Sequence, residues 1–166
     1  MERKVVLITG GSRGIGAATA RMAAHRGWDV VISYQHQRDA AEAVVADVQL
    51  AGTRALAVQA DVGDEAEVLA LFGAVDAQFG RLDALVNNAG VVDRAQTVAE
   101  MSVQRLERMF RVNTIGSFIC AREAVRRMST RHGGRGGAIV NVSSIASRLG
   151  APGQYVDYAA AKGALD

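Results

Sequence analysis

The stretch KVVLITGGSRGIG, residues 4–16, joins a short apolar run to a glycine cluster and then to a helical pattern. The apolar run suits a buried strand, and residues 14–26 suit a helix that begins inside the glycine cluster. Gly10 permits a tight turn, Gly14 allows close approach of a phosphate, and Gly16 lets helix and strand pack closely. The free N–H groups of the helix N-terminus suit a pyrophosphate. A glycine triplet alone is weak evidence, but its position between strand and helix predicts a dinucleotide-binding βα unit.

Strand-like and helical segments alternate along the rest of the chain. The sequence predicts further strands at 28–34, 54–60, 82–88 and 137–144, with helices at 39–51, 64–79 and 102–131. Asp64 and Glu67 have the spacing of a capping box. Strands that alternate with helices indicate βαβ units on a parallel sheet. We therefore expect an α/β fold, a Rossmann-type doubly wound parallel sheet, in a single domain spanning residues 1–166.

Composition argues against several classes of protein. No apolar run has the length of a membrane span, and the glycine cluster begins too early for a signal-peptide core. The single cysteine, Cys120, excludes an internal disulfide, and its apolar neighbours suggest a small buried side chain. The three histidines lack metal-ligand spacing. We expect a cytoplasmic protein with no membrane contact and no metal site.

The basic residues are unevenly distributed, although the net charge is only +2. Five arginines crowd the stretch from 122 to 135: Arg122, Arg126, Arg127, Arg131 and Arg135. A nucleic-acid surface would be expected to place aromatic residues among them, and there are none. Cations favoured by the dipole at a helix C-terminus are the better interpretation, so we expect no nucleic-acid partner.

A second chemical motif lies in YVDYAAAKGALD, residues 155–166. Tyr158 and Lys162 are four residues apart and would share one face of a helix, whereas Tyr155 has no cation at that offset. A nearby ammonium stabilises the deprotonated form of a tyrosine hydroxyl. Apart from Lys4, Lys162 is the only lysine among 19 basic residues, which suggests that arginine would not serve here. Tyr158 is therefore the candidate for proton transfer. The alternative is a solvated lysine beside a packing tyrosine.

Three motifs in order resemble those of the short-chain dehydrogenase/reductase family. They are Thr9-Gly10-x-x-x-Gly14-x-Gly16, Asn87-Asn88-Ala89-Gly90 and Tyr158-x-x-x-Lys162. The likeness spans residues 4–166 and is nearest to 3-oxoacyl-carrier-protein reductases and glucose dehydrogenases. It implies hydride transfer between a nicotinamide cofactor and a carbonyl or secondary alcohol substrate.

The resemblance also implies catalytic roles. Tyr158 would be the general acid or base, and Lys162 would assist it and bind the nicotinamide ribose. Ser144 would polarise the substrate oxygen, with Ser143 as the alternative because side chains alternate along a strand. Asn113 would hold a water beside Lys162, or would instead bond the backbone of its own helix. Ser144 and Tyr158 lie one residue further apart than in the nearest relatives, so the segment between them is expected to bulge over the substrate.

The implied cofactor contacts fall on five segments of the chain. The residues are Gly10, Ser12, Arg13, Gly14, Ile15, Gly16, Gln35, Asp61, Val62, Asn88, Ala89 and Gly90, with Tyr158 and Lys162 at the nicotinamide end. Asp61 has an alternative role in helix entry, and Asn87 is expected to brace neighbouring strands. The segments 91–94 and 148–155 are expected to line part of the substrate pocket.

The second strand bears on the choice of cofactor. NAD-binding sites usually place an acid at the end of this strand to bind the ribose 2′-hydroxyl. Here the strand ends at Tyr34, and no acid follows before Asp39. Arg13 in the glycine loop and Arg38 after the strand could both face a 2′-phosphate. The sequence therefore predicts NADP.

The last residues predict that the chain is a C-terminally incomplete part of a longer enzyme. Leu165 and Asp166 offer no C-cap glycine, and the family continues with further strands. We expect a homodimer or homotetramer when full length, and little turnover from this piece alone. The alternative function is a non-catalytic nucleotide-binding or regulatory protein of the same fold. The intact candidate catalytic residues argue against it.

Overall fold

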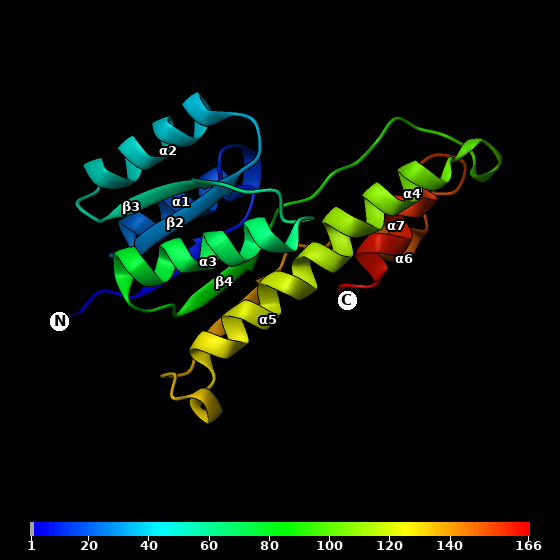
Figure 1. The fold of residues 1–166 in the computed structure, drawn as a ribbon. Coiled ribbons are helices and arrows are strands. Elements are labelled where there is room, and N and C mark those ends of the chain that lie inside the picture. Colours follow the sequence, from blue (N-terminus) through cyan, green and yellow to red (C-terminus); the bar gives the residue numbers. More distant parts are fainter. Residues whose placement is uncertain (1) are drawn as a thin grey trace.

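The computed structural model describes residues 2–166, which form a parallel five-stranded sheet (Figure 1). The strands are β1 (Val5–Ile8), β2 (Asp29–Tyr34), β3 (Ala55–Gln59), β4 (Ala84–Asn87) and β5 (Ala138–Asn141). Their order is β3-β2-β1-β4-β5, and every neighbouring pair is parallel. The chain reverses its direction of winding between β3 and β4, on either side of β1. The predicted Rossmann-type doubly wound sheet is confirmed.

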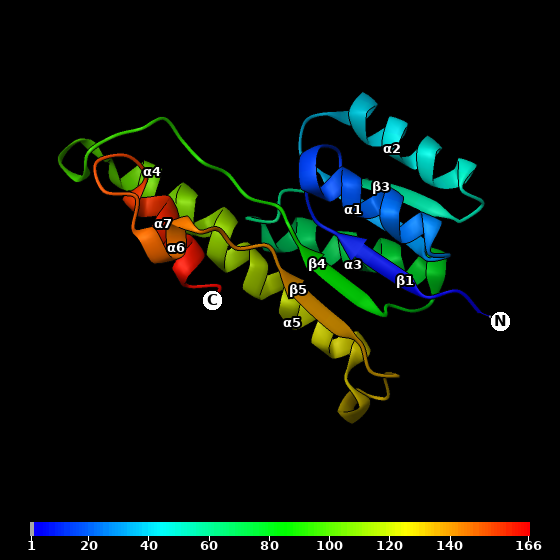
Figure 2. The ribbon, with the colours of Figure 1, turned by 180° about the vertical axis from the view of Figure 1, so that it is seen from behind.

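Helices cover both faces of the sheet, as Figures 1 and 2 show. One face packs against α1 (Gly14–His25) and α2 (Arg38–Leu50), and the other against α3 (Glu65–Phe79) and α5 (Gly116–Met128). Side chains of β1 alternate between the two cores: Val6 and Ile8 face the first pair of helices, and Val5 and Leu7 face the second. This alternation is the two-residue period of a strand that is buried on both faces.

A third group of helices lies beyond the carboxyl ends of the strands (Figures 1 and 2). It contains α4 (Val103–Phe110), α6 (Ala146–Leu149) and α7 (Val156–Gly163). Two 3₁₀ turns, η1 (Val98–Glu100) and η3 (Thr130–His132), follow β4 and α5 in the chain. None of the helices within residues 2–166 is both long and apolar enough to cross a membrane.

The helix expected over 102–131 is interrupted. A π-helical turn, η2 (Arg111–Ile115), separates α4 from α5. Inside it, the Asn113 side chain donates to the Met109 carbonyl at 3.0 Å and so competes for an acceptor of the helix backbone. Gly116 follows, where a Cβ would lie 2.6 Å from the Val62 carbonyl oxygen. The helix therefore changes its winding where it passes closest to the end of the sheet.

The predicted capping box is only half formed. Asp64 accepts hydrogen bonds from the N–H groups of Ala66 and Glu67 at 2.8 and 3.1 Å, as an N-cap should. The Glu67 carboxylate does not return to Asp64. It accepts instead from the N–H of Asp61 at 2.7 Å. This contact fixes the loop between β3 and α3.

The arginines of α5 are not simply cations at a helix end. Glu123 is 3% exposed and accepts from Arg122, Arg126 and Arg127 at 3.1, 2.8 and 3.0 Å. Arg127 also binds Asp76 of α3 at 2.7 Å. Arg127 therefore ties α5 to α3, and the buried Glu123 holds the three arginines together within α5. The nearby Cys120 is buried as expected, and burial raises the pKa of its thiol to about 12.

Glu123→Gln is expected to destabilise the fold at neutral pH by about 3 kcal/mol, because it removes the buried acid from three guanidinium groups. Burial raises the pKa of Glu123, but hydrogen bonds and charge from the arginines outweigh it and hold this pKa below its ordinary value of 4.5. The carboxylate therefore stabilises the fold fully at pH values above the ordinary pKa. This contribution is lost as the pH falls through the lowered pKa. Urea unfolding of both proteins across the acid range checks the prediction. An equal loss of stability in both below about pH 5 would contradict it.

Candidate functional site

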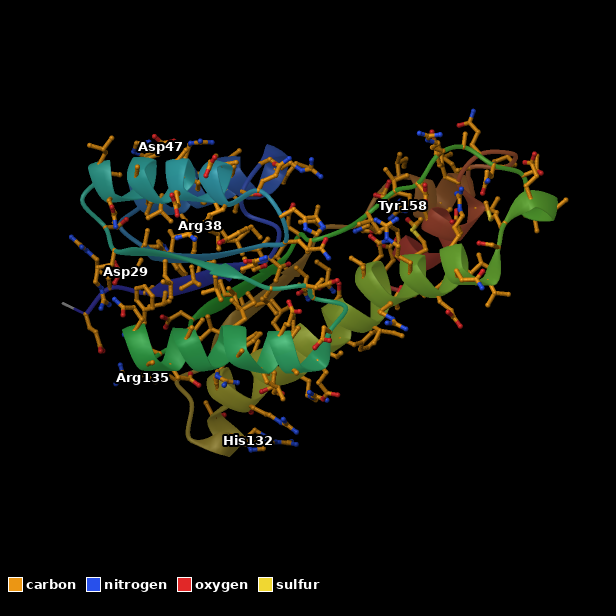
Figure 3. The ribbon with its side chains drawn as sticks, turned by 45° about the horizontal axis from the view of Figure 1, so that its top comes forward. Asp29, Arg38, Asp47, His132, Arg135 and Tyr158 are labelled. Carbon is orange, nitrogen blue, oxygen red and sulfur yellow. The ribbon has the colours of Figure 1, made fainter. Side chains whose placement is uncertain are left out.

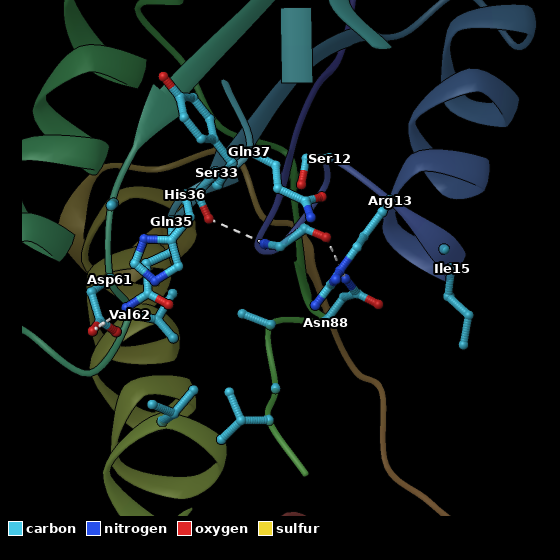
Figure 4. A pocket seen from close by; sticks show the side chains of 18 residues that line it. Ser12, Arg13, Ile15, Ser33, Gln35, His36, Gln37, Asp61, Val62 and Asn88 are labelled. Atoms are coloured by element: carbon cyan, nitrogen blue, oxygen red, sulfur yellow. Dashed lines mark hydrogen bonds between the residues drawn. The ribbon is translucent and has the colours of Figure 1, made fainter. Parts of the chain in front are cut away.

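A cavity of about 400 Å³ opens at the carboxyl ends of β1, β2 and β4, the position where open α/β sheets bind ligands (Figure 4). It is lined by Gly10, Ser12, Arg13, Gly14, Ile15, Ser33, Tyr34, Gln35, His36, Gln37, Ala60, Asp61, Val62, Asn88, Ala89, Gly90, Val91 and Val112. In Figure 4, Arg13 and Ile15 lie on the α1 side, whereas Gln35, His36 and Asp61 lie across the cavity.

The glycine loop lets three segments meet without side chains between them. Gly10 has φ +64°, and a Cβ there would lie 2.9 Å from the Ala89 Cα. A Cβ on Gly16 would lie 2.5 Å from both the Asn88 Nδ2 and the Gly10 carbonyl oxygen. The glycines therefore let the start of α1 pack closely against the loop after β1 and against the Asn88 side chain after β4. They form a cradle that side chains would fill.

The first turn of α1 faces this cavity with its N–H groups free of side-chain caps from the described residues. Arg13 lies at the N-cap position and lines the cavity beside that turn. Arg38 does not line the cavity. Its guanidinium binds Glu42 one turn along α2, at 2.7 Å. Of the two arginines expected to face a 2′-phosphate, only Arg13 lines the cavity in this structure.

The opposite wall is organised around Asp61, which lies two residues beyond the end of β3. One carboxylate oxygen accepts from the Gln35 amide at 2.6 Å, and the other accepts from the Gly63 N–H at 2.8 Å. Asp61 thus shapes the turn into α3 and also presents its side chain to the cavity. The contact with Gly63 agrees with the expected helix-entry role, and the adenine contact stays a prediction.

The motif Asn87–Gly90, which begins at the end of β4, is hydrogen-bonded to the segment that follows β1. The Thr9 hydroxyl accepts from the N–H groups of Asn88 and Ala89, both at 3.0 Å, and the Asn88 amide donates back to the Thr9 and Gly10 carbonyls. Asn87 instead donates to Ser117 and Asn141, at 3.1 and 3.0 Å. The expectation that Asn87 braces neighbouring elements agrees with these contacts.

Tyr158 and Lys162 lie on one face of α7, in the part of the molecule shown at the upper right of Figure 3. Lys162 is 4% exposed, its ammonium lies 5.9 Å from the centre of the Tyr158 ring, and its Nζ donates to the Val142 carbonyl at 2.8 Å. Burial lowers the pKa of Lys162, and the charge of Asp166 opposes this effect. A buried ammonium beside a half-buried tyrosine is an arrangement suited to proton transfer.

Lys162 and Asn113 converge on Gly90, at the edge of the cavity. A Cβ on Gly90 would lie 2.7 Å from the Asn113 Oδ1 and 3.5 Å from the Lys162 Nζ. The Asn113 side chain also exchanges two hydrogen bonds with the backbone of Val91, at 2.9 and 3.0 Å. Asn113 therefore fixes the chain after β4 at the point where the lysine meets the cavity.

The two serines lie beyond the end of β5 rather than within it. The Ser144 hydroxyl accepts from the N–H of Ala146 at 3.2 Å and so helps to start α6, whereas the Ser143 hydroxyl donates to the Lys162 carbonyl at 3.4 Å. The segment that follows contains α6 and a tight turn in which Ala151 has φ +43°. This local structure fills the segment between Ser144 and Tyr158.

Comparison with known proteins decides the family. Residues 4–166 match the family model for short chain dehydrogenases. The chain belongs to the short-chain dehydrogenase family. Over 98% of its length it is 51% identical to an uncharacterized oxidoreductase of Escherichia coli, and over its full length it is 43% identical to versicolorin reductase 1 of Aspergillus parasiticus.

Solved structures of short-chain dehydrogenases show the same architecture. A short-chain dehydrogenase/reductase from Serratia marcescens superposes with a TM-score of 0.90 at 37% identity, covering 98% of this chain and 64% of that one. A 3-oxoacyl-[acyl-carrier-protein] reductase of Staphylococcus aureus is 40% identical over 96% of the chain. The chain spans between 61% and 66% of the length of the curated short-chain dehydrogenases named above.

The structure gathers most of the predicted cofactor residues of this short-chain dehydrogenase around one cavity. Those that do not line it are Gly16, which packs beneath the loop, and Tyr158 and Lys162, which lie beyond its edge at Gly90. Val91, which also lines the cavity, belongs to a segment expected at the substrate pocket. Sequence reasoning missed six lining residues: Ser33, Tyr34, His36, Gln37, Ala60 and Val112. Five of them adjoin predicted strand ends, which is the signal that could have found them. Within residues 2–166, no group of acids, histidines or cysteine is arranged to hold a metal ion.

Proposed function

We propose that the complete protein is an oxidoreductase that transfers a hydride between NADP(H) and a carbonyl or secondary alcohol. The observation that carries this proposal is the convergence of Lys162 and Asn113 on Gly90. There, the buried Lys162 of the tyrosine–lysine pair reaches the edge of a cavity built like a dinucleotide site. A buried ammonium paired with a tyrosine favours proton transfer over nucleotide binding alone.

The residues fit a dinucleotide along the length of the cavity. The pyrophosphate would lie on the glycine loop and the first turn of α1, and the adenine would lie near Asp61 and Val62. The adenosine ribose would pass Asn88 to Gly90, and the nicotinamide ribose would reach Lys162. The bound nicotinamide supplies or accepts the hydride.

The chain's own groups would handle the proton. Tyr158 would donate its hydroxyl proton to the oxygen of a ketone undergoing reduction, or accept one from an alcohol undergoing oxidation. Lys162 would stabilise the phenolate that remains, and Asn113 would hold the loop against which the lysine rests. Ser144 would hydrogen-bond the substrate oxygen, with Ser143 as the alternative.

The test follows the nicotinamide absorbance of the complete protein with a panel of ketones and secondary alcohols. We expect consumption of NADPH that depends on both protein and ketone. A protein that binds NADPH tightly but turns over no member of the panel would favour the non-catalytic, nucleotide-binding alternative.

We infer a preference for NADP over NAD from the charges around the cavity. Arg13 lies beside the first turn of α1, and the chain after β2 presents Gln35, His36 and Gln37 rather than an acid. A 2′-phosphate would meet a guanidinium there and no carboxylate at the end of β2. An arginine is well suited to bind a phosphate through parallel hydrogen bonds.

Arg13→Ala is expected to weaken NADPH binding by about tenfold, because one charge-assisted hydrogen bond is lost, and to leave NADH binding nearly unchanged. Arg38→Ala is the matched control, since Arg38 binds Glu42 and not the cavity. Fluorescence titration of both cofactors measures the effect. NADH binding as tightly as NADPH in the unaltered protein would overturn the preference.

We also infer that the complete protein is a homodimer or homotetramer. Ile115 and Phe118 expose 52% and 63% of their surface, and with Val125 they form an apolar strip along η2 and α5. Such a strip suits a helix-to-helix contact between copies of the chain. Sedimentation of the complete protein and of a Phe118→Glu variant tests this inference. A monomer at micromolar concentration would contradict it.

A further inference from the structure

Arg105 of α4 joins segments that lie far apart in the sequence. Its Nε and Nη2 donate to the two carboxylate oxygens of Asp157 in α7, at 2.7 and 3.2 Å. Its Nη1 donates to the Arg94 carbonyl at 2.6 Å and to the Gln96 side-chain oxygen at 2.7 Å. One guanidinium therefore connects α4, the chain after β4 and the beginning of α7.

The ion pair between Arg105 and Asp157 is buried. Their side chains are 7% and 0% exposed. Burial raises the pKa of Asp157, but hydrogen bonds from Arg105 and from backbone N–H groups, with the arginine's charge, outweigh it and lower this pKa. A buried pair needs such well-directed hydrogen bonds, and the planar fork of an arginine provides them.

Asp157 immediately precedes Tyr158 in the first turn of α7. The same end of α7 is approached by a second contact, from the Gln96 N–H to the Gln154 carbonyl at 3.0 Å. The far end of α7 is held separately, where the Thr114 hydroxyl donates to the Ala161 carbonyl at 3.0 Å. Arg105 thus controls the end of the helix that carries the tyrosine, and it does not line the cofactor cavity.

We propose that Arg105 is a positioning residue for hydride transfer, which sets the tyrosine hydroxyl relative to the cofactor cavity and to the chain at 94–97. This role rests on the proposed function. Lysine could keep a charge near Asp157, but as a single point charge it could not make the two parallel bonds and also bind the 94–97 segment. Small displacements of a reacting group cost large factors in rate.

The experiment compares Arg105→Lys and Arg105→Met with the unaltered complete protein. With a ketone and NADPH, we expect kcat to fall by about tenfold in Arg105→Lys. The loss in Arg105→Met should be at least as large. The primary deuterium isotope effect on kcat, measured with NADPH deuterated at the transferred position, should rise because the hydride step becomes slower. The Kd of NADPH should change by less than about twofold.

Arg127→Lys is the matched control, since Arg127 also binds a buried acid, Glu123, and joins α5 to α3 through the exposed Asp76. It should reduce stability without changing kcat or the isotope effect of the folded enzyme. If Arg105→Lys behaves like this control, or if it retains full kcat, the positioning role is overturned. Asp157→Asn keeps the inference testable if both Arg105 variants fail to fold, and an unchanged kcat and isotope effect would likewise overturn it. Absence of turnover in the unaltered protein would overturn the proposed function and this role together.

Discussion

Tyr158→Phe in the complete protein is expected to lower kcat by about 1,000-fold and to change the Kd of NADPH by less than about twofold. The substitution removes the hydroxyl that would exchange a proton with the substrate oxygen. It keeps the ring that lies over the buried Lys162 ammonium, at 5.9 Å. Steady-state turnover and fluorescence titration of the cofactor measure the two effects separately.

Tyr155→Phe is the control for this prediction. Tyr155 lies at the N-cap of α7, three residues before Tyr158, and the residue four positions after it is Ala159 rather than a lysine. Its substitution should change the KM of the substrate more than kcat. Equal losses of kcat from the two substitutions would show that the tyrosines have been assigned wrongly.

Gly16→Ala is expected to weaken NADPH binding by about 100-fold, the equivalent of two lost charge-assisted hydrogen bonds to phosphate. The added Cβ would lie 2.5 Å from the Asn88 side chain and from the Gly10 carbonyl oxygen. The Asn88 amide is held by hydrogen bonds to the Thr9 and Gly10 carbonyls, and the Gly10 oxygen belongs to the main chain. Neither group can therefore move away easily. The first turn of α1 must move away from the phosphates instead.

Gly73→Ala provides the matched control, because a Cβ at that position in α3 meets nothing within 4 Å. This change should stabilise the protein slightly and leave cofactor binding unaltered. Calorimetric titration with NADPH and thermal unfolding of both variants are the measurements. A Gly16→Ala protein that binds NADPH normally would show that the close packing at this loop is not required.

The sequence predicted the fold well because the signals for it are local. The buried strands, the glycine loop and the α1, α2 and α3 patterns each lie within one short segment, and a parallel sheet with alternating helices follows from their order. The interruption at η2 was not predictable from periodicity. It depends on the Asn113 side chain, whose contacts reach across to Val91.

The candidate site likewise has a part that the sequence predicts and a part that it does not. Residues within motifs, such as Arg13 and the glycines, could be placed from sequence because their neighbours along the chain define the loop. The bond between Gln35 and Asp61 and the pair between Arg105 and Asp157 join positions 26 and 52 residues apart. No pattern within a single sequence predicts such pairs, since they form only after the fold brings the segments together.

The most direct test of hydride transfer follows deuterium from cofactor to product. The complete protein would reduce a ketone with NADPH deuterated at the transferred position, and the alcohol would be analysed by NMR. We expect deuterium on the carbinol carbon, and no labelled product with Tyr158→Phe beyond its small residual rate. Alcohol that lacks deuterium at that carbon, whichever face of the nicotinamide carries the label, would contradict the account.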